Sequence, residues 1–485
     1  MSEDLLLKII FCWFVCGGVA WRAYCQEDRE TSLEKPEENR TRYINHIPVL
    51  AFPMFILMLL GFNAVFYGWE YSIKSVLVMC FEVLIQITLL YIVLLLVMPF
   101  LRKYFSSRTC AALWMLPTFL YLIRQVTSTT EKPLVVLSAS DQVIKIAATI
   151  WVAGFIIVFG YYIVSHLTFR HRILKDAVVI TDEMTLKVWE DEKEYTNIHN
   201  KFGIVISSET KTPLSIGLLR RTTKVVLPQR MYTEEELHLI FRHELIHIGR
   251  EDSCTKFFLL FCTALGWFNP FMWAAMRMSA DDLELSCDET VLLDVEEDVR
   301  KKYAELILNT TGERRGFTTC LSASATALKY RLRNVMQIRK RWNGGMFVGL
   351  VLFLFLMTSG YVALAYETGA GEEYILNWES AEAYTLESIH LYDGIEYKYP
   401  KCTDENAFID YLSNLEMLRI SEYYTFSNDE KRMNCYFIGN EKAIGVTLTD
   451  QSVQLSYLGE DNLGDEMYYL KSEVDWKYLE SLLED

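Results

Sequence analysis

The sequence predicts a multi-pass α-helical membrane protein that carries two α+β domains outside the hydrocarbon. Apolar residues make up 51% of the 485 residues and are concentrated in long runs. Most of these runs are long enough to cross about 30 Å of hydrocarbon. Two polar stretches, 168–344 and 367–485, are long enough to fold as domains. The apolar runs are residues 5–21, 47–68, 72–100, 109–123, 142–167 and 345–366.

The basic residues predict how these runs cross the membrane. Four clusters of Lys and Arg lie on one side if six spans alternate from an external N-terminus. We therefore expect an N-terminal membrane domain over 1–167, a cytoplasmic domain over 168–344, a last transmembrane helix over 345–366 and an extracellular domain over 367–485. The runs at 5–21 and 109–123 are short, so each can instead be re-entrant, and a count of four to six spans stays open. The clusters are Arg22 to Arg42, Arg102 to Arg108, Arg170 to Lys175 and Arg331 to Arg341.

The predicted extracellular domain is strongly acidic. Residues 367–485 hold 8 Lys or Arg and 26 Asp or Glu, a net charge of −18, so the remaining chain carries +2 of the total of −16. Such a domain is not expected to bind nucleic acid or anionic lipid. Two interpretations stay open, simple solubility and binding of a cationic ligand. Cys402 and Cys435 are the cysteines of this segment, and a disulfide between them is one of two open expectations, the other being free thiols.

Two histidines four residues apart give the strongest chemical signal in the chain. His243 and His247 flank Glu244 in the pattern H-E-x-x-H, in a chain with 8 histidines. On an α-helix this spacing places both imidazoles on one face, where they can bind one ion. A carboxylate between them can take a proton from water at that ion. The pattern predicts Zn²⁺ held by both histidines, with Glu244 as the catalytic base; two exposed surface histidines are the alternative.

The helix that carries this motif has recognisable ends. Thr233 followed by Glu236 is typical of a capping box, and acidic residues in the first turn suit the helix dipole. We expect Gly249 to end the helix in a left-handed conformation. One face is expected to be buried, because it carries the apolar residues Leu237, Ile240, Phe241 and Ile246.

A zinc site that performs chemistry needs a third protein ligand and one open position. Asn269-Pro270 predicts the N-cap and first residue of a second helix. On that helix Glu284 and Asp288 share a face, so one carboxylate can bind the metal while the other hydrogen-bonds a ligand histidine. Glu284 is the predicted third ligand, and a solvated acidic run is the alternative. Cys287 is expected to be a buried packing residue off that face, not a ligand.

Several motifs, in the same order along the chain, resemble the BlaR1/MecR1 family of integral-membrane metallopeptidases, peptidase family M56. The resemblance is dense from about residue 140 to 340 and extends to the N-terminal spans by topology alone. The matching motifs are Thr212 to Gly217, Val225 to Pro228, His243 to Asp252, Trp267 to Pro270, Asp282 to Asp288, and Gly316-Phe317 followed by Leu328 to Arg333.

The resemblance implies a gluzincin-like cytoplasmic domain in the plasma membrane of a bacterium, coupled to an external sensor of cell-wall stress. It implies that Glu284 completes the Zn²⁺ ligands, with Asp288 and Asp252 as outer partners. The β-lactam receptors of the family carry a penicillin-binding sensor with an S-x-x-K motif. Here the two S-x-x-K matches, Ser32 to Lys35 and Ser208 to Lys211, fall on the predicted cytoplasmic side. We therefore expect a non-penicillin-binding extracellular domain whose ligand is unknown.

Three further segments have two interpretations each. Arg277 lies seven residues before Glu284 and can contact substrate or an oxyanion, or can be a solvated charge. Receptors of the resembled family undergo autoproteolysis near this region, so the loop with Arg314 and Arg315 is either an autocleavage site or a basic juxtamembrane loop. Phe257 to Leu265 is too short to span a membrane and is expected to pack in the domain core or at the membrane surface.

Together these observations predict a membrane-embedded zinc metalloendopeptidase that acts as a signal transducer. External sensing would trigger cleavage of the chain itself, of a cytoplasmic transcriptional repressor, or of both. The substrate is expected to bind extended along the short strands Gly203 to Ser207 and Leu214 to Ile216, unless these are fully paired. A non-proteolytic transmembrane receptor and a constitutive quality-control membrane protease are the alternative functions. The lipid bilayer is an expected partner, direct nucleic-acid binding is not expected, and a homodimer is left open.

Overall fold

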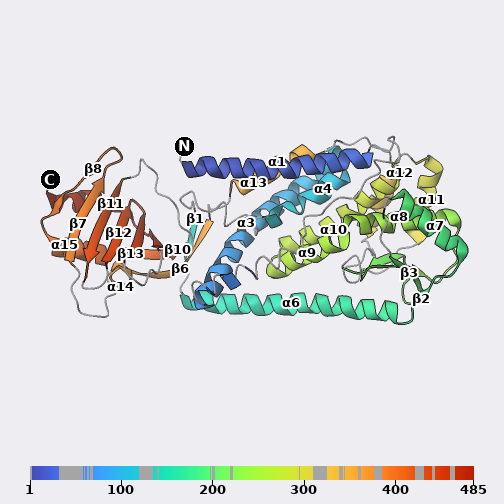
Figure 1. Cartoon of the computed structure of the whole chain (residues 1–485), viewed down its shortest axis with the longest axis horizontal. Coiled ribbons are helices and arrows are strands. Elements are labelled where there is room, and N and C mark those ends of the chain that lie inside the picture. Colours follow the sequence, from blue (N-terminus) through green and yellow to red (C-terminus); the bar gives the residue numbers. More distant parts are fainter. Residues whose placement is uncertain are drawn as a thin grey trace.

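The computed structural model is an elongated molecule with a β-sheet domain at one end and the H-E-x-x-H helix near the other (Figure 1). Three long helices run between the two ends, α1 (Glu3–Thr31), α3 (Trp69–Tyr104) and α6 (Asp141–Lys175). The structure describes residues 3–31, 58, 61–62, 65, 69–119, 135–138, 141–196, 198, 202–218, 222–293, 295–309, 325–337, 342, 344–358, 362–375, 385–420, 431–439, 443–458 and 465–484.

Two helical stretches among these residues are long and apolar enough to cross a membrane, Val78–Tyr104 in α3 and Lys145–Lys175 in α6. Lys8–Trp21 and Gly345–Leu356 are shorter apolar helices. The runs at 72–100 and 142–167 therefore lie in long helices as predicted. The run at 47–68 lies largely outside the described residues.

Two of the predicted spans are not long helices. In 109–123 the chain forms the short helix α4 (Ser107–Leu113) and the 3₁₀ turn η2 (Leu116–Phe119). Among its described residues, Leu113, Trp114 and Leu116 are buried against other parts of the protein. In 345–366 the helix α13 (Gly345–Leu356) ends early, and Val362 begins strand β6 (Val362–Ala370). The backbone there pairs with strand β10 (Glu416–Ile420) of the terminal sheet.

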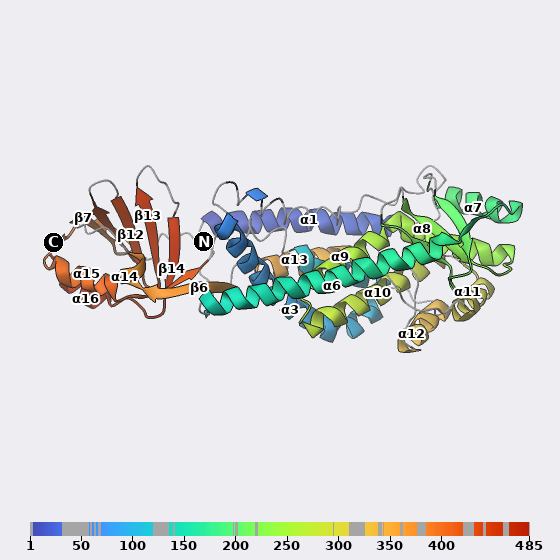
Figure 2. The ribbon, with the colours of Figure 1, turned by 90° about the horizontal axis from the view of Figure 1, so that it is seen from below.

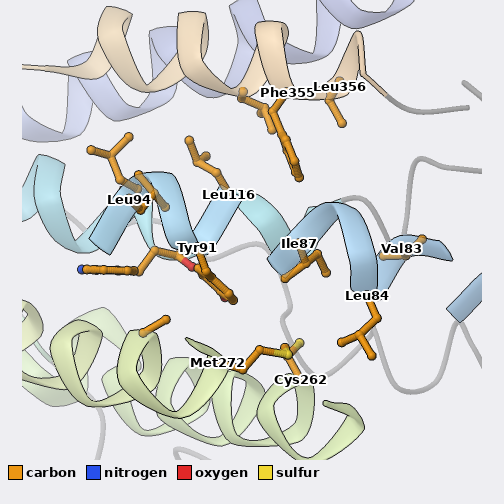
Figure 3. Close-up of a cluster of buried hydrophobic side chains, with 14 of the residues drawn as sticks. Val83, Leu84, Ile87, Tyr91, Leu94, Leu116, Cys262, Met272, Phe355 and Leu356 are labelled. Atoms are coloured by element: carbon orange, nitrogen blue, oxygen red, sulfur yellow. The ribbon is translucent and has the colours of Figure 1, made fainter. Parts of the chain in front are cut away.

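A helical hairpin inserts between the long helices. It consists of α9 (Asp252–Leu265) and α10 (Pro270–Val291), which pack against α3 (Figure 3). At its tip the Asn269 amide donates to Thr88 of α3 at 2.6 Å, and the Trp267 indole donates to the Trp151 carbonyl of α6 at 3.2 Å. The apolar run from Phe257 to Leu265 thus packs beside both candidate spans. Part of the segment 168–344 therefore packs directly against both candidate spans.

The remainder of that segment forms a small α+β unit. Its sheet has the order β2-β3-β5-β4, with β4 at one edge. Helices from both sides of the motif pack around one apolar core that includes Phe241, Trp189 and Tyr303. The strands are β2 (Val178–Val179), β3 (Gly203–Ser207), β4 (Leu214–Ile216) and β5 (Lys224–Pro228). The helices are α7 (Glu183–Tyr195), α8 (Glu234–Arg250), α11 (Glu297–Asn309) and α12 (Ala325–Met336).

The sheet domain at the other end has nine strands in the order β1-β6-β10-β14-β13-β12-β11-β7-β8. Helices α14 (Gly371–Tyr374), α15 (Glu405–Ser413) and α16 (Trp476–Ser481) lie along it (Figure 2). Strand β1 (Val135–Ser138) precedes α6 in the chain yet pairs in parallel with β6. The sheet therefore starts before residue 367 and includes a strand from the N-terminal region. The other strands are β7 (Thr385–Tyr392), β8 (Tyr397–Lys398), β11 (Arg432–Ile438), β12 (Ala443–Thr449), β13 (Ser452–Leu458) and β14 (Asp465–Leu470); β9 (Lys401–Cys402) and β15 (Leu483–Glu484) form a separate pair.

Candidate metal centre

Helix α8 is held at both ends by its own sequence. The predicted capping box is present, with Thr233 accepting from the Glu236 backbone and Glu236 accepting from the Thr233 backbone. At its C-terminus the left-handed residue is Glu251, with φ 55° and ψ 38°, and not Gly249 as predicted. A non-glycine residue in this conformation is strained, and here it lets α9 begin at once. The abrupt turn brings Asp252 back to the last turn of α8.

The two histidines of the motif face each other. The Nε2 atoms of His243 and His247 are 3.1 Å apart. Glu284, on α10, points its Oε2 atom at both, 3.7 Å from His243 Nε2 and 3.4 Å from His247 Nε2. Glu284 and His247 are almost completely buried, at 1% exposure each. The structure thus brings the three predicted ligands together from two helices.

The spacing of these three atoms fits a small tetrahedral cation. Bonds of about 2.0–2.1 Å at tetrahedral angles separate ligand atoms by about 3.3 Å. The three distances of 3.1, 3.4 and 3.7 Å surround that value. Glu284 Oε2 is also buried with no hydrogen-bond donor among the described residues. A buried carboxylate oxygen without a donor is costly, and a cation bound there would satisfy it.

Charges around the site favour a cation. Burial lowers the pKa of both imidazoles, but neighbouring groups, Cys287 first and then Glu284, outweigh it; they raise the pKa of His243 to about 9 and that of His247 well above its ordinary value. Burial raises the pKa of Glu284, but Lys256 and the two histidines hold it well below its usual range. The carboxylate is therefore ionised, and positive charge between these groups is stabilised.

The outer nitrogens of both ligand histidines have partners. His247 Nδ1 lies 2.6 Å from Asp252 Oδ2, the direct contact expected of an outer partner. His243 Nδ1 lies 2.9 Å from the Tyr303 hydroxyl of α11, and 3.6 Å from Asp288 Oδ1. Asp288 therefore reaches His243 through Tyr303. Such contacts fix the orientation of a metal-binding imidazole.

Two cations also approach the predicted third ligand. Lys256 of α9 donates from Nζ to Glu284 Oε1 at 3.0 Å. Arg331 of α12 lies with Nη1 3.9 Å from Glu284 Oε2 and donates from Nη2 to Asp288 Oδ1 at 2.7 Å. Sequence spacing gave no signal for Lys256, Tyr303 or Arg331, because each comes from a different helix and none shares a motif with the histidines.

Cys287 lies closer to the site than predicted. Its side chain packs in the apolar core as expected, but its sulfur is 3.4 Å from His243 Nδ1. One donor atom each from His243, His247 and Cys287 lie within 4.8 Å of one another. The prediction was wrong about the face, since a residue three after Glu284 is its neighbour on a helix. Burial raises the pKa of the thiol, but the two histidines outweigh burial and lower it.

The acidic run on α10 is not solvated. Asp282, Glu284 and Asp288 are all buried, at 0%, 1% and 3% exposure. Asp282 accepts two hydrogen bonds from Arg102, at 2.8 and 2.9 Å, and one from the Trp114 indole at 2.7 Å. Arg102 is in the last turn of α3. Helix α10 is thus fixed to the C-terminal end of α3, a candidate membrane span.

Of the remaining predicted site residues, only Glu244 lies next to a metal donor among the described residues. It is buried in α8 beside His243, at 3% exposure. Arg277 is exposed, about 10 Å before Glu284 along α10 at 1.5 Å per residue; its charge acts on Tyr162 of α6. Arg314 and Arg315 lie outside the described residues. Cys402 and Cys435 are free thiols, the second of the two expectations that the sequence left open.

A helix with H-E-x-x-H and a glutamate from a second helix form the donor set of a metallopeptidase. This class agrees with the sequence comparisons. Residues 123–335 match the family model described as BlaR1 peptidase M56. The comparisons support assignment of residues 123–335 to the BlaR1/MecR1 family of M56 peptidases.

Curated relatives resemble a limited part of the chain. The regulatory protein BlaR1 of Bacillus licheniformis is 26% identical over 196 residues, which are 40% of this chain and 32% of that protein. The methicillin resistance mecR1 protein of Staphylococcus aureus is 27% identical over 165 residues, 33% of this chain and 27% of that protein. The chain thus spans less than a third of the length of each of these relatives.

Proposed function

We propose that this chain is a membrane-embedded zinc metalloendopeptidase that transduces a signal from its sheet domain to a cytoplasmic substrate. One observation carries the proposal: three donor atoms, Nε2 of His243, Nε2 of His247 and Oε2 of Glu284, lie at the spacing of a tetrahedral cation, and the residues that carry the last two are buried. A catalytic base, Glu244, stands between the two histidines in the motif. A purely structural site needs no such base.

The chemistry divides among a few side chains. Zn²⁺ bound to this donor set would polarise a peptide carbonyl and lower the pKa of an open-position water to about 7. Glu244 would accept the proton of the attacking water and deliver it to the leaving amine. General-base help of this kind is typically worth about 10²–10⁴-fold in rate. Asp252 holds His247 in the tautomer that leaves Nε2 free.

An extended peptide can reach this site along the small sheet. β4 is an edge strand and packs against α8. A peptide that adds to such an edge makes backbone hydrogen bonds and runs past the helix that carries His243. The proposed substrates are a cytoplasmic transcriptional repressor and the chain's own segment around Arg314 and Arg315. Both place the site on the cytoplasmic face of a bacterial plasma membrane, with the N-terminus and sheet domain outside.

Contacts between the three parts of the molecule support signal transduction. The sheet domain is continuous with α13 through β6, and holds β1 directly before α6. At the other end, Arg102 of α3 is paired with Asp282 of α10, two residues before Glu284. If the sheet domain moves the long helices, α10 and its predicted ligand Glu284 would therefore be displaced as well.

The test compares cells that make the wild-type chain with cells that make Glu244→Gln. Glu244→Gln should bind zinc like the wild type, because Glu244 is not a ligand, and should lose cleavage products of a repressor and of the chain itself. Proteome-wide search for truncated cytoplasmic proteins measures this. Arg277→Gln, at an exposed position away from the metal donors, is the matched control.

Each outcome separates the proposal from its alternatives. Unchanged signalling in Glu244→Gln would favour a non-proteolytic receptor. Cleavage of misfolded membrane proteins that persists after removal of residues 376–485 would favour a constitutive quality-control protease. Loss of repressor cleavage both in Glu244→Gln and after removal of residues 376–485 supports the signal-transducing peptidase.

A further inference from the structure

Three side chains, from α12, α10 and α11, form a hydrogen-bonded series that ends at the Nδ1 atom of His243. Arg331 of α12 binds both oxygens of Asp288, which lies on α10. Asp288 Oδ1 accepts from the Tyr303 hydroxyl of α11 at 2.7 Å. The same hydroxyl lies 2.9 Å from His243 Nδ1. Each member is at least largely buried, with the Arg331 side chain 13% exposed.

The donors and acceptors in this hydrogen-bonded series follow from the chemistry of Arg331 and Asp288. An ionised carboxylate only accepts, and a guanidinium only donates. Tyr303 must therefore use its one O–H group to donate a hydrogen bond to Asp288. Its oxygen is then left to accept, so a neutral, metal-binding His243 must carry its proton on Nδ1. That tautomer leaves the Nε2 lone pair directed at His247 and Glu284, where a cation would bind.

We propose that Tyr303 is the positioning residue of His243, and that Arg331 fixes it from α12 through Asp288. The proposal rests on the proposed function, because it assigns a role at the same metal centre. The ring of Tyr303 packs in the apolar core, and its hydroxyl alone makes the two polar contacts. The core role and the positioning role therefore belong to different atoms.

The geometry also indicates what happens when the hydroxyl is removed. The other polar atoms near His243 Nδ1 are Cys287 Sγ at 3.4 Å, which accepts a hydrogen bond only weakly, and Asp288 Oδ1 at 3.6 Å, which is beyond hydrogen-bond distance. Without the hydroxyl, His243 would lose its one strong hydrogen bond at Nδ1, and its orientation and tautomer would be fixed less firmly. Outer partners of metal-bound histidines are typically worth about 10–100-fold in metal affinity or activity.

The experiment measures metal binding by the full-length protein in detergent. Zn²⁺ affinity is determined by competition with a chelator, and Co²⁺ is used as a spectroscopic probe of the ligand field. Tyr303→Phe is expected to weaken Zn²⁺ binding by about 10–100-fold and to alter the Co²⁺ spectrum. Arg331→Lys, which keeps the charge but cannot bind both oxygens of Asp288, should shift both measurements in the same direction by less.

The control is Tyr232→Phe, a tyrosine packed against the same core whose ring contacts Arg230 at 4.4 Å and not the metal centre. Tyr232→Phe should bind zinc like the wild type. Equal zinc affinity and an equal Co²⁺ spectrum in Tyr303→Phe and the wild type would overturn the inference and leave the proposed peptidase standing. Failure of the wild-type chain itself to take up Zn²⁺ would overturn both.

Discussion

The metal-motif domain and the sheet domain both pack helices on a sheet, but they bury charge very differently. Helices α8, α9 and α10 bury seven acidic or basic side chains, which are Glu244, His247, Arg250, Asp252, Asp282, Glu284 and Asp288. In the described part of the sheet domain, the buried polar side chains are Thr449 and Ser452, and neither is charged.

This contrast shows that a stable fold does not require buried charges, whereas the proposed metal chemistry does. Removing a charge from water costs several kcal/mol even when it is paired. The sheet domain avoids that cost with an apolar core, in which Phe437 and Leu455 are fully buried. In the metal-motif domain, this free-energy cost is offset by ion pairs such as Arg102–Asp282 and His247–Asp252. The proposed peptidase reaction is therefore assigned to the metal-motif domain, and the proposed sensing to the sheet domain.

The largest effect should follow from loss of a ligand. In His247→Ala one of three donors is removed and Asp252 loses its imidazole partner. Zinc affinity should fall by more than the approximately 10–100-fold typical of outer partners. The matched change in the sheet domain is Val446→Ala, at a buried core position, which should lower stability and leave zinc affinity unchanged. Chelator competition on both variants measures this.

A result in which Val446→Ala weakens zinc binding as much as His247→Ala would break the comparison. It would mean that the metal centre depends on the sheet domain for its integrity. The assignment of separate roles to the metal-motif domain and the sheet domain would then be wrong.

A smaller effect is expected from breaking ion pairs at the two ends. Asp282→Ala leaves Arg102 without its buried partner, and removing one member of such a pair typically costs about 3–5 kcal/mol. Glu416→Ala removes an exposed pair with Lys471 in the sheet domain, where about 0–1 kcal/mol is typical. Denaturant unfolding of both variants in detergent gives the two costs. Equal costs would show that burial of Asp282 does not matter.

Local features of the metal centre could be predicted from the sequence. The capping box at Thr233 and Glu236 and the Asn269-Pro270 helix start both depend on residues within one turn, and the structure confirms them. The shared face of His243 and His247 follows from helical periodicity alone. Such signals require no knowledge of the rest of the fold.

Features that depend on distant segments could not be predicted in this way. Tyr303 meets His243 although 60 residues separate them. β1 pairs with β6 only because α6 and α13 bring both to the same end. The apolar composition of 109–123 predicts a membrane span or a re-entrant segment, but Trp114 is buried against protein. Composition does not distinguish lipid from a protein core.

The smallest effect should come from Cys287, and it sharpens the assignment of the third ligand. If Glu284 binds the metal, Cys287→Ser should change zinc affinity by less than the approximately 10–100-fold of an outer partner, and Co²⁺ in the wild type should lack a sulfur-to-metal charge-transfer band. In Glu284→Ala that band should appear, because Cys287 is a donor within 4.8 Å of both histidines. A strong band in the wild type would instead make Cys287 the third ligand. Lys256 would then have no role at the metal, since its contact is with Glu284.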